Sequence, residues 1–212
     1  MIPTIGRPEL LLDTLKFLSA CVPASAEVLI VDQSPDCVSA GVLDQLDLPG
    51  ARVIPCAGHG RGLAVNEGLR AAANEMVAIV DDDCVVGAEW IAVVDRELTR
   101  DPSAVICGQV LPSGDPARTP STLILNEPRE YTGEIRGDVL YAGNMACRRE
   151  DVLSFGGFDE RIVPAAEDCD FCYRWLRAGR HLRHVPELIV WHCDWRERDE
   201  LRRHYVGYHE GR

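Results

Sequence analysis

Residues 77–83 read Val-Ala-Ile-Val-Asp-Asp-Asp, a short apolar run that ends in three adjacent acids. Runs of this length that are rich in β-branched side chains are typical of strands buried inside a sheet. Residues 28–31 (VLIV) form a second run of the same kind, which also ends in an acid, Asp32. Val53-Ile54 is a weaker third run. The first half of the chain therefore predicts three strands, and carboxylates follow two of them.

Helical patterns separate these strands. Residues 10–18 and 63–73 carry apolar side chains at the three- and four-residue spacing of one helix face. Strands that alternate with helices predict an α/β fold, with a Rossmann-like, mainly parallel sheet flanked by helices. Ligands of such sheets bind beyond the carboxyl ends of the strands, so the acids lie where a site is expected.

The second half of the chain has a less regular pattern. Residues 104–110, 139–147 and 188–191 are expected strands, and a Pro- and Gly-rich loop over residues 111–120 separates the first two. Residues 168–178 form an expected helix that ends before Gly179. No internal repeat or low-complexity linker interrupts the chain, so we expect a single domain over residues 1–212.

The carboxylates of residues 81–83 repel one another, and something must compensate for that repulsion. One interpretation places them in solvent, or at the cap of a helix that begins near Ala88. The other has them holding Mg²⁺ or Mn²⁺, hard cations that prefer carboxylate oxygen and keep positions open for phosphate. The Glu167-Asp168 pair is equally ambiguous, because the helix dipole favours acids in a first turn whatever their function. The residues alone leave both pairs of interpretations open.

Seven short motifs follow one another along the chain. They are 2–7 (IPTIGR), 31–34 (VDQS), 62–69 (GLAVNEGL), 81–83 (DDD), 143–149 (GNMACRR), 156–160 (GGFDE) and 167–168 (ED). In this order they resemble the family 2, GT-A-fold glycosyltransferases, and the resemblance spans Ile2 to about His192. Each motif is weak by itself, and the shared order is what makes the resemblance specific.

The resemblance implies a GT-A fold with a nucleotide-sugar-binding half over residues 1–110. An acceptor-side half with a short antiparallel part would cover residues 111–195, and a C-terminal tail would cover residues 196–212. The residues implied around the nucleobase and ribose of the donor are Pro3, Thr4, Arg7 and Asp32. Asp81 would approach the ribose, and the same donor pocket would be bordered by Arg61, Asn66 and Asp82.

The resemblance also implies the chemistry. Asp83 would contact the Mn²⁺ or Mg²⁺ ion that bridges the diphosphate, with His192 as a second metal ligand or a diphosphate contact. Such an ion stabilises the leaving diphosphate, and a carboxylate takes the proton of the attacking hydroxyl. Asp168 would be that base, and Glu167 would orient the site or the acceptor. One base and one metal suffice for a single displacement, so we expect inversion at the anomeric carbon, with a UDP-sugar as the default donor.

The chain departs from the family pattern in places. Val65 stands where many members carry Arg, so one diphosphate contact is absent unless Arg61 replaces it. No Gln stands three residues before Arg174-Trp175, where Phe171 is found, so processive polymer synthesis is not expected.

Two rival functions remain to be weighed. A sugar nucleotidyltransferase would open with a Gly-rich loop carrying Arg and Lys, but residues 2–11 hold one Gly and no Lys. A catalytically inactive binding module on the same scaffold would not need both acid clusters, and both are kept.

The formal net charge of −12 argues against DNA or RNA as a partner, because nucleic-acid binding depends on neutralising phosphates with Lys and Arg. A small nucleotide is compatible with this charge, since a divalent cation neutralises its diphosphate locally. The acceptor could be a carbohydrate, a lipid-linked molecule or a small molecule, and the protein could form a homodimer. We expect a cytoplasmic protein, peripheral to the inner face of the membrane if its acceptor is lipid-linked, because no signal peptide or membrane-spanning run is found.

Nine cysteines are spread along the chain, and the closest pair is Cys169 and Cys172. Together with His192 and Cys193 they could supply four zinc ligands, although the spacing is not that of a usual zinc site. Reduced, mostly buried thiols are the expected state.

Overall fold

A computed structural model describes residues 1–23, 25–119, 121–133, 138–163 and 165–193. Its first sheet consists of three parallel strands in which β2 (Val28–Asp32) lies between β1 (Ile2–Thr4) and β3 (Ala51–Pro55). All five residues of β2 are buried, as its continuous apolar run predicts for a central strand.

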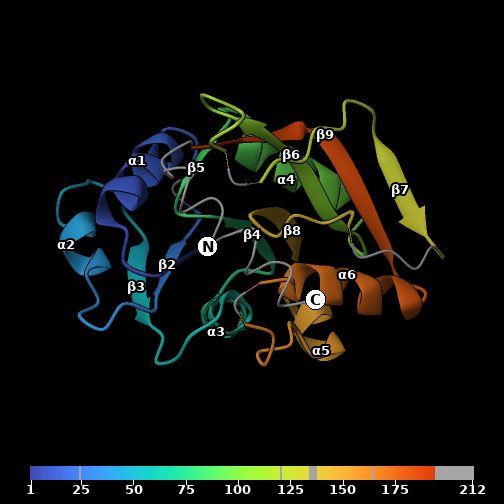
Figure 1. The fold of residues 1–212 in the computed structure, drawn as a ribbon, viewed down its shortest axis with the longest axis horizontal. Coiled ribbons are helices and arrows are strands. Elements are labelled where there is room, and N and C mark those ends of the chain that lie inside the picture. Colours follow the sequence, from blue (N-terminus) through green and yellow to red (C-terminus); the bar gives the residue numbers. More distant parts are fainter. Residues whose placement is uncertain (24, 120, 134–137, 164, 194–212) are drawn as a thin grey trace.

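Helices α1 (Pro8–Ser19) and α2 (Ser39–Leu43) connect these strands, and α3 (Arg61–Ala71) follows β3. Proline in the first turn of α1 costs no hydrogen bond, because the first amides of a helix lack intrahelical partners. Leu11, Leu15 and Leu18 repeat at helical spacing and form the buried face of α1. In Figure 1, α1 and α2 lie on the left beside the three-stranded sheet.

A second, six-stranded sheet holds the rest of the strands. Its order is β4 (Met76–Val80), β8 (Asn144–Arg148), β6 (Val105–Pro112), β9 (His181–His192) and β5 (Cys84–Val86), with β7 (Arg129–Thr132) also paired to β9. Only the β6–β9 pair of this sheet is parallel. The remaining helices of the described chain are α4 (Trp90–Arg100), α5 (Arg149–Phe155) and α6 (Glu167–Arg177).

Backbone hydrogen bonds join the two sheets at β1 and β4. The Met1 amino group donates to the Ala78 carbonyl over 2.8 Å, and the Val80 amide donates to the Met1 carbonyl over 3.1 Å. This is the pattern of a parallel pair, so β1, β2 and β4 end at the same edge. The acids that follow β2 and β4 therefore share that edge with the residues that follow β1.

The α/β class is confirmed, and so are the strands predicted around residues 28–31, 53–54, 77–80 and 104–110. The antiparallel pairing is more extensive than a short acceptor-side part, because β8 lies between β4 and β6 and is antiparallel to both. The strand expected over residues 139–147 begins only at Asn144. A turn precedes it, with the Asn144 amide bonded to the Tyr141 carbonyl over 3.0 Å. The strand expected over residues 188–191 already starts at His181.

Five of the cysteines are buried thiols, in line with the expected state: Cys56, Cys84, Cys107, Cys147 and Cys172. No helix in the described part of the chain has the length and apolar character needed to cross a membrane.

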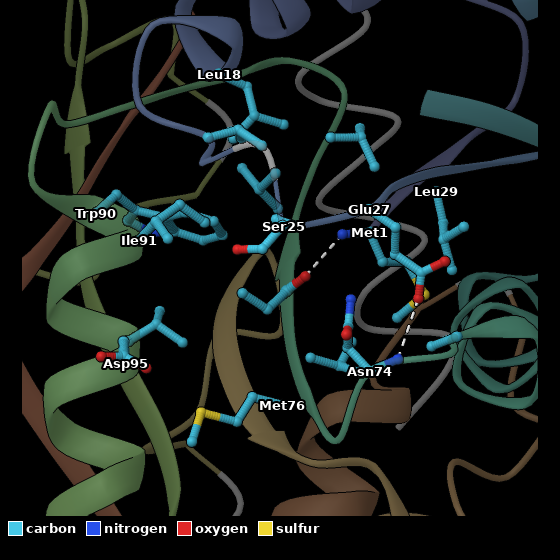
Figure 2. Close-up of a pocket in the computed structure, with 18 of the residues that line it drawn as sticks. Met1, Leu18, Ser25, Glu27, Leu29, Asn74, Met76, Trp90, Ile91 and Asp95 are labelled. Atoms are coloured by element: carbon cyan, nitrogen blue, oxygen red, sulfur yellow. Dashed lines mark hydrogen bonds between the residues drawn. The ribbon is translucent and has the colours of Figure 1, made fainter. Parts of the chain in front are cut away.

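A cavity of about 360 Å³ lies beside Met1, between β2 and β4 (Figure 2). The β1–β2 register starts at Ile2 and Ile30, so Val28 and Leu29 extend past the start of β1 and line this cavity. The Met1 amino group is buried at its edge, and burial lowers the pKa of this amine from 8.0 to about 5. The cavity therefore continues the line of β1 within the sheet.

We expect three added residues, Val-Ser-Val ahead of Met1, to extend β1 into this cavity. Burial of their apolar side chains should raise the free energy of unfolding by about 1–3 kcal/mol.

In a polypeptide that starts at Met1, the amino group of the unfolded chain is protonated between pH 5 and 8, whereas the amino group of the folded chain has lost that proton. Stability should then rise with pH across this window, by up to about 1.4 kcal/mol per unit, and the extension should remove that slope.

Urea unfolding at pH 6, 7 and 8 measures both effects. A Gly-Ser-Gly extension is the matched control, because it displaces the amine without supplying apolar side chains. Equal stability of the two extended chains would show that the cavity does not accept a strand.

Candidate active site

Asp82 is the most buried of the three acids that follow β4, with 0% of its surface exposed. Its carboxylate accepts a 2.5 Å hydrogen bond from the Thr4 hydroxyl and forms an ion pair with the Arg7 guanidinium. Burial raises the pKa of Asp82 to about 6, against the opposing effect of Arg7. Asp82 therefore ties the end of β4 to the end of β1 and to the start of α1.

Asp83 faces the last residue of β9. Its Oδ2 lies 2.9 Å from Arg7 Nη1, and its Oδ1 lies 3.2 Å from His192 Nε2. Strand pairing brings these residues together, because Cys84 on β5 is opposite His192 on β9. Asp83, Cys84 and His192 are the acid, thiol and imidazole groups of the described chain that lie close enough together to hold a metal ion.

The His192 imidazole has one nitrogen available as a ligand. Its Nδ1 lies 3.0 Å from the Ser121 carbonyl, so we assign the ring proton to Nδ1. Nε2 is buried and lies 3.2 Å from Asp83 Oδ1, so it faces that carboxylate either as a protonated donor or across a bound cation. A buried histidine held by a carbonyl at one nitrogen, with the other directed at a carboxylate, fits a divalent cation. Burial lowers the pKa of His192 and the Asp83 carboxylate raises it, with a net upward shift, which also indicates a place that favours positive charge.

Asp81 is more accessible and contacts two further side chains. Its Oδ1 accepts from Arg61 Nε over 3.0 Å and from Arg61 Nη2 over 2.7 Å, and its Oδ2 accepts from the Tyr141 hydroxyl over 3.2 Å. Arg61 begins α3, and its Nη1 reaches Glu167 Oε1 over 3.4 Å. Burial acts to lower the pKa of Arg61, but Asp81 and Glu167 outweigh it and raise that pKa further. One guanidinium therefore connects the acids after β4 with the acids that begin α6.

Glu167 and Asp168 form the first turn of α6. Burial, together with the neighbouring Asp168 carboxylate, raises the pKa of Glu167 to about 7, against the opposing effect of Arg61. Burial also raises the pKa of Asp168, although Arg61 and two backbone amides, those of Cys169 and Ala142, act against it. Carboxylates with raised pKa values accept protons more readily near neutral pH, as a general base must.

The structure thus brings most of the predicted site residues into one connected network. They are Thr4, Arg7, Arg61, Asp81, Asp82, Asp83, Glu167, Asp168 and His192. Pro3 is buried within β1 next to Thr4. Asp32 ends β2 at the same edge, but its carboxylate accepts the amides of Ser34 over 2.7 Å and Ser39 over 3.0 Å. Its contacts within the chain hold the loop after β2 in place.

Asn66, expected to border the donor pocket, is not part of this network. Its Nδ2 donates to the Phe158 carbonyl over 2.9 Å and to Glu160 over 2.8 Å, while its Oδ1 accepts the Phe158 amide over 3.0 Å. Asn66 therefore fastens the loop over residues 156–160 to α3. These contacts engage both polar atoms of the amide, and a place for Asn66 at the border of the donor pocket stays a prediction. The zinc set suggested for Cys169 and Cys172 is likewise absent from the metal-sized group found in the described residues.

Sequence reasoning missed Tyr141, which contacts Asp81 and also lies 3.4 Å from His192 Nδ1. It stands two residues ahead of the motif at 143–149, so the motif marked its neighbourhood but not its role. The strand expected over residues 139–147 concealed the turn that directs this side chain to the site.

Arg7→Ala should destabilise the fold, because it leaves the carboxylate of Asp82 buried without its partner. Loss of one member of a buried ion pair costs about 3–5 kcal/mol, and the partial exposure of Arg7 places our expectation near 3 kcal/mol. Arg70→Ala is the matched control, since Arg70 pairs with Glu67 and Glu160 at the surface and should cost less than about 1 kcal/mol. Chemical unfolding of both variants measures the difference, and similar losses would contradict a structural role for the Arg7–Asp82 pair.

Comparison with solved structures shows the fold. The chain aligns with the crystal structure of GalNAc-T7 with UDP, GalNAc and Mn²⁺ at a TM-score of 0.70 and 19% identity, covering 91% of this chain and 43% of that one. For S. aureus TarS 1–349 in complex with UDP-GlcNAc the TM-score is 0.71 at 18% identity, covering 95% and 59%. The mannosyltransferase PcManGT from Pyrobaculum calidifontis, in complex with GDP-Man and Mn²⁺, gives 0.68 at 20% identity, covering 98% and 61%. The expected GT-A fold is confirmed.

Sequence comparison gives the relatives. The pre-mycofactocin glycosyltransferase of Mycobacterium tuberculosis is 30% identical over an alignment of 146 residues that covers 63% of this chain. The chain covers only 30% of the length of that curated relative. The sequence model of the family described as "Glycosyltransferase like family 2" matches residues 1–204, nearly the whole chain, and the chain therefore belongs to that family.

Proposed function

We propose that this chain carries a metal-dependent transfer site, which moves a sugar from a nucleotide-diphosphate sugar to an acceptor hydroxyl with inversion. The observation that carries the proposal is the Arg61 bridge, which joins the acids after β4 to the acids that begin α6. The acids after β4 suit a donor with its cation, and the acids that begin α6 suit an acceptor that must lose a proton. A UDP-sugar is the first donor to test, because two of the similar structures hold UDP or UDP-GlcNAc.

Asp83 and His192 are the residues that would hold Mn²⁺ or Mg²⁺. The buried Nε2 of His192 and the adjacent Asp83 carboxylate fit such an ion, and Mn²⁺ is present in two of the similar structures. When bound, the ion would act as a Lewis acid for the departing diphosphate. Arg7 and Arg61 would favour the ionised forms of Asp82 and Glu167, against the effect of burial on the pKa values of these two carboxylates.

Asp168 is the proposed base. Its Oδ1 is held by the Cys169 amide over 2.8 Å, which fixes the carboxylate at the start of α6. Glu167, only 4% exposed, would orient the site through Arg61 rather than meet the acceptor. With a single base and a single displacement, the configuration at the anomeric carbon inverts.

Thermal-shift measurements with UDP, GDP and dTDP, each with and without Mn²⁺, test the donor. A ligand that binds only the folded state stabilises it by about 2.7 kcal/mol at a hundred times its dissociation constant. Release of nucleotide diphosphate from the matching sugar donor then separates an enzyme from a binding module, which would show the shift without release.

Asp83→Ala should weaken binding of Mn²⁺ by about 100-fold or more, because it removes a proposed ligand directly. The fold should be retained, since the change also relieves repulsion between Asp83 and Asp82. Calorimetric titration with Mn²⁺ in the presence of UDP measures this, with Asp13→Ala on the exposed face of α1 as control. Unchanged Mn²⁺ binding in Asp83→Ala, or UDP binding that neither Asp83→Ala nor a chelator changes, would show that the assignment of Asp83 to a metal site is wrong.

Asp168→Asn keeps the shape of the side chain but cannot accept a proton. Donor binding should stay near that of wild type, while kcat for transfer should fall by about 10²–10⁴-fold. Glu167→Gln should lower kcat by less, because the proposed role of Glu167 is to orient the site. Steady-state kinetics on both variants decide whether Asp168 or Glu167 is the base. An Asp168→Asn protein that transfers at the wild-type rate would leave Glu167 as the candidate base.

A further inference from the structure

Tyr141 touches both sides of the site, although it belongs to none of the acid motifs. We propose that Tyr141 is a positioning residue, whose hydroxyl holds Asp81 and His192 in their working orientation. The turn that it begins, residues 141–143, sets these groups against Asp168. This inference rests on the proposed function.

The contacts of the Tyr141 hydroxyl indicate that this side chain orients Asp81 and does more than fill space. The Tyr141 hydroxyl donates to Asp81 Oδ2 over 3.2 Å, while Asp81 Oδ1 accepts from Arg61. A carboxylate held at both oxygens by different side chains cannot rotate freely. Without the hydroxyl, Arg61 would be the side chain among the described residues that still hydrogen-bonds to this carboxylate.

The same hydroxyl lies beside the imidazole. Its oxygen is 3.4 Å from His192 Nδ1, and the two rings are tilted by 52° with centroids 6.1 Å apart. Nδ1 already contacts the Ser121 carbonyl, so the phenol and that carbonyl together fix the ring plane. This plane directs Nε2 at Asp83. Groups that orient a ligand in this way commonly change metal affinity by 10–100-fold when they are removed.

The turn extends this positioning to the proposed base. The Ala142 amide donates to the Asp168 carboxylate, and the Asn144 amide closes the turn on the Tyr141 carbonyl over 3.0 Å. A Cβ at position 143 would overlap both Asp81 Oδ2 and the Tyr141 ring, so only glycine allows the turn to lie this close. Three consecutive residues therefore contact the acid after β4 and the acid that begins α6.

Tyr141→Phe tests the hydroxyl while keeping the ring. Tyr173→Phe on the exposed face of α6 is the matched control, since the Tyr173 hydroxyl accepts a 3.4 Å hydrogen bond from Arg177 at the surface, away from the acids. We expect Tyr141→Phe to melt within a few degrees of wild type and to bind Mn²⁺ alone about 10-fold more weakly by electron paramagnetic resonance. Its kcat for transfer should fall by about 10-fold with the acceptor KM little changed, and Tyr173→Phe should match wild type throughout.

A double variant separates orientation from general destabilisation. If the hydroxyl acts partly through Asp81, then Tyr141→Phe combined with Asp81→Asn should weaken Mn²⁺ binding by less than the product of the two single losses. Full additivity of the two losses, or Mn²⁺ binding and kcat of Tyr141→Phe equal to those of wild type, would overturn the proposal. So would a wild-type protein that does not bind Mn²⁺.

The Mn²⁺ measurement needs no donor, which keeps the two hypotheses apart. A wild-type protein that binds Mn²⁺ but transfers no sugar would overturn the proposed function, and the Mn²⁺ affinities would still decide the role of Tyr141.

Discussion

The Arg61 guanidinium between Asp81 and Glu167 is the interaction on which the arrangement of the site depends. Without a cation between them, the acids after β4 and those that begin α6 would repel one another across a partly buried space. Arginine suits this position because its planar group donates from several nitrogens at once, whereas a lysine ammonium is a single point of charge. Arg61 is also the first residue of α3, so its backbone is fixed by the helix and its reach spans both clusters.

The position of these acids follows from the way the two sheets are joined. Because β1 pairs with β2 on one side and is bonded to β4 on the other, the ends of three strands meet at one edge. Thr4 and Arg7 can then reach Asp82, and His192 reaches Asp83 from the far side of the second sheet. Thr4, Asp82 and His192 come from distant parts of the chain, and the pairing of their strands brings them to one edge.

Apolar runs followed by acids were enough to predict the strands that carry Asp32 and residues 81–83, because buried strands have a strong local pattern. The helix that begins with Glu167 could be predicted for the same reason, together with its end before Gly179. Local pattern could not show that Asn66 serves a loop more than 90 residues away, since both of its polar atoms are engaged by long-range contacts. It also could not show the turn over residues 141–143, because β-branched and apolar residues on either side resemble a continuous strand. That turn exists because Asp81 needs room, which is a property of the tertiary structure.

The twelve-residue strand β9 has a consequence for the order in which the protein is made. It pairs with β5, β6 and β7 at once, and its last residue is His192. These partners are about 50 to 110 residues earlier in the chain, so the pairing of β9 closes long loops, which is slow in folding. During synthesis, the acids after β4 leave the ribosome well before the histidine that faces them. Asp83 and His192, the two proposed cation ligands, therefore come together only when β9 joins the sheet, and a nascent chain lacks this pair until that sheet has formed.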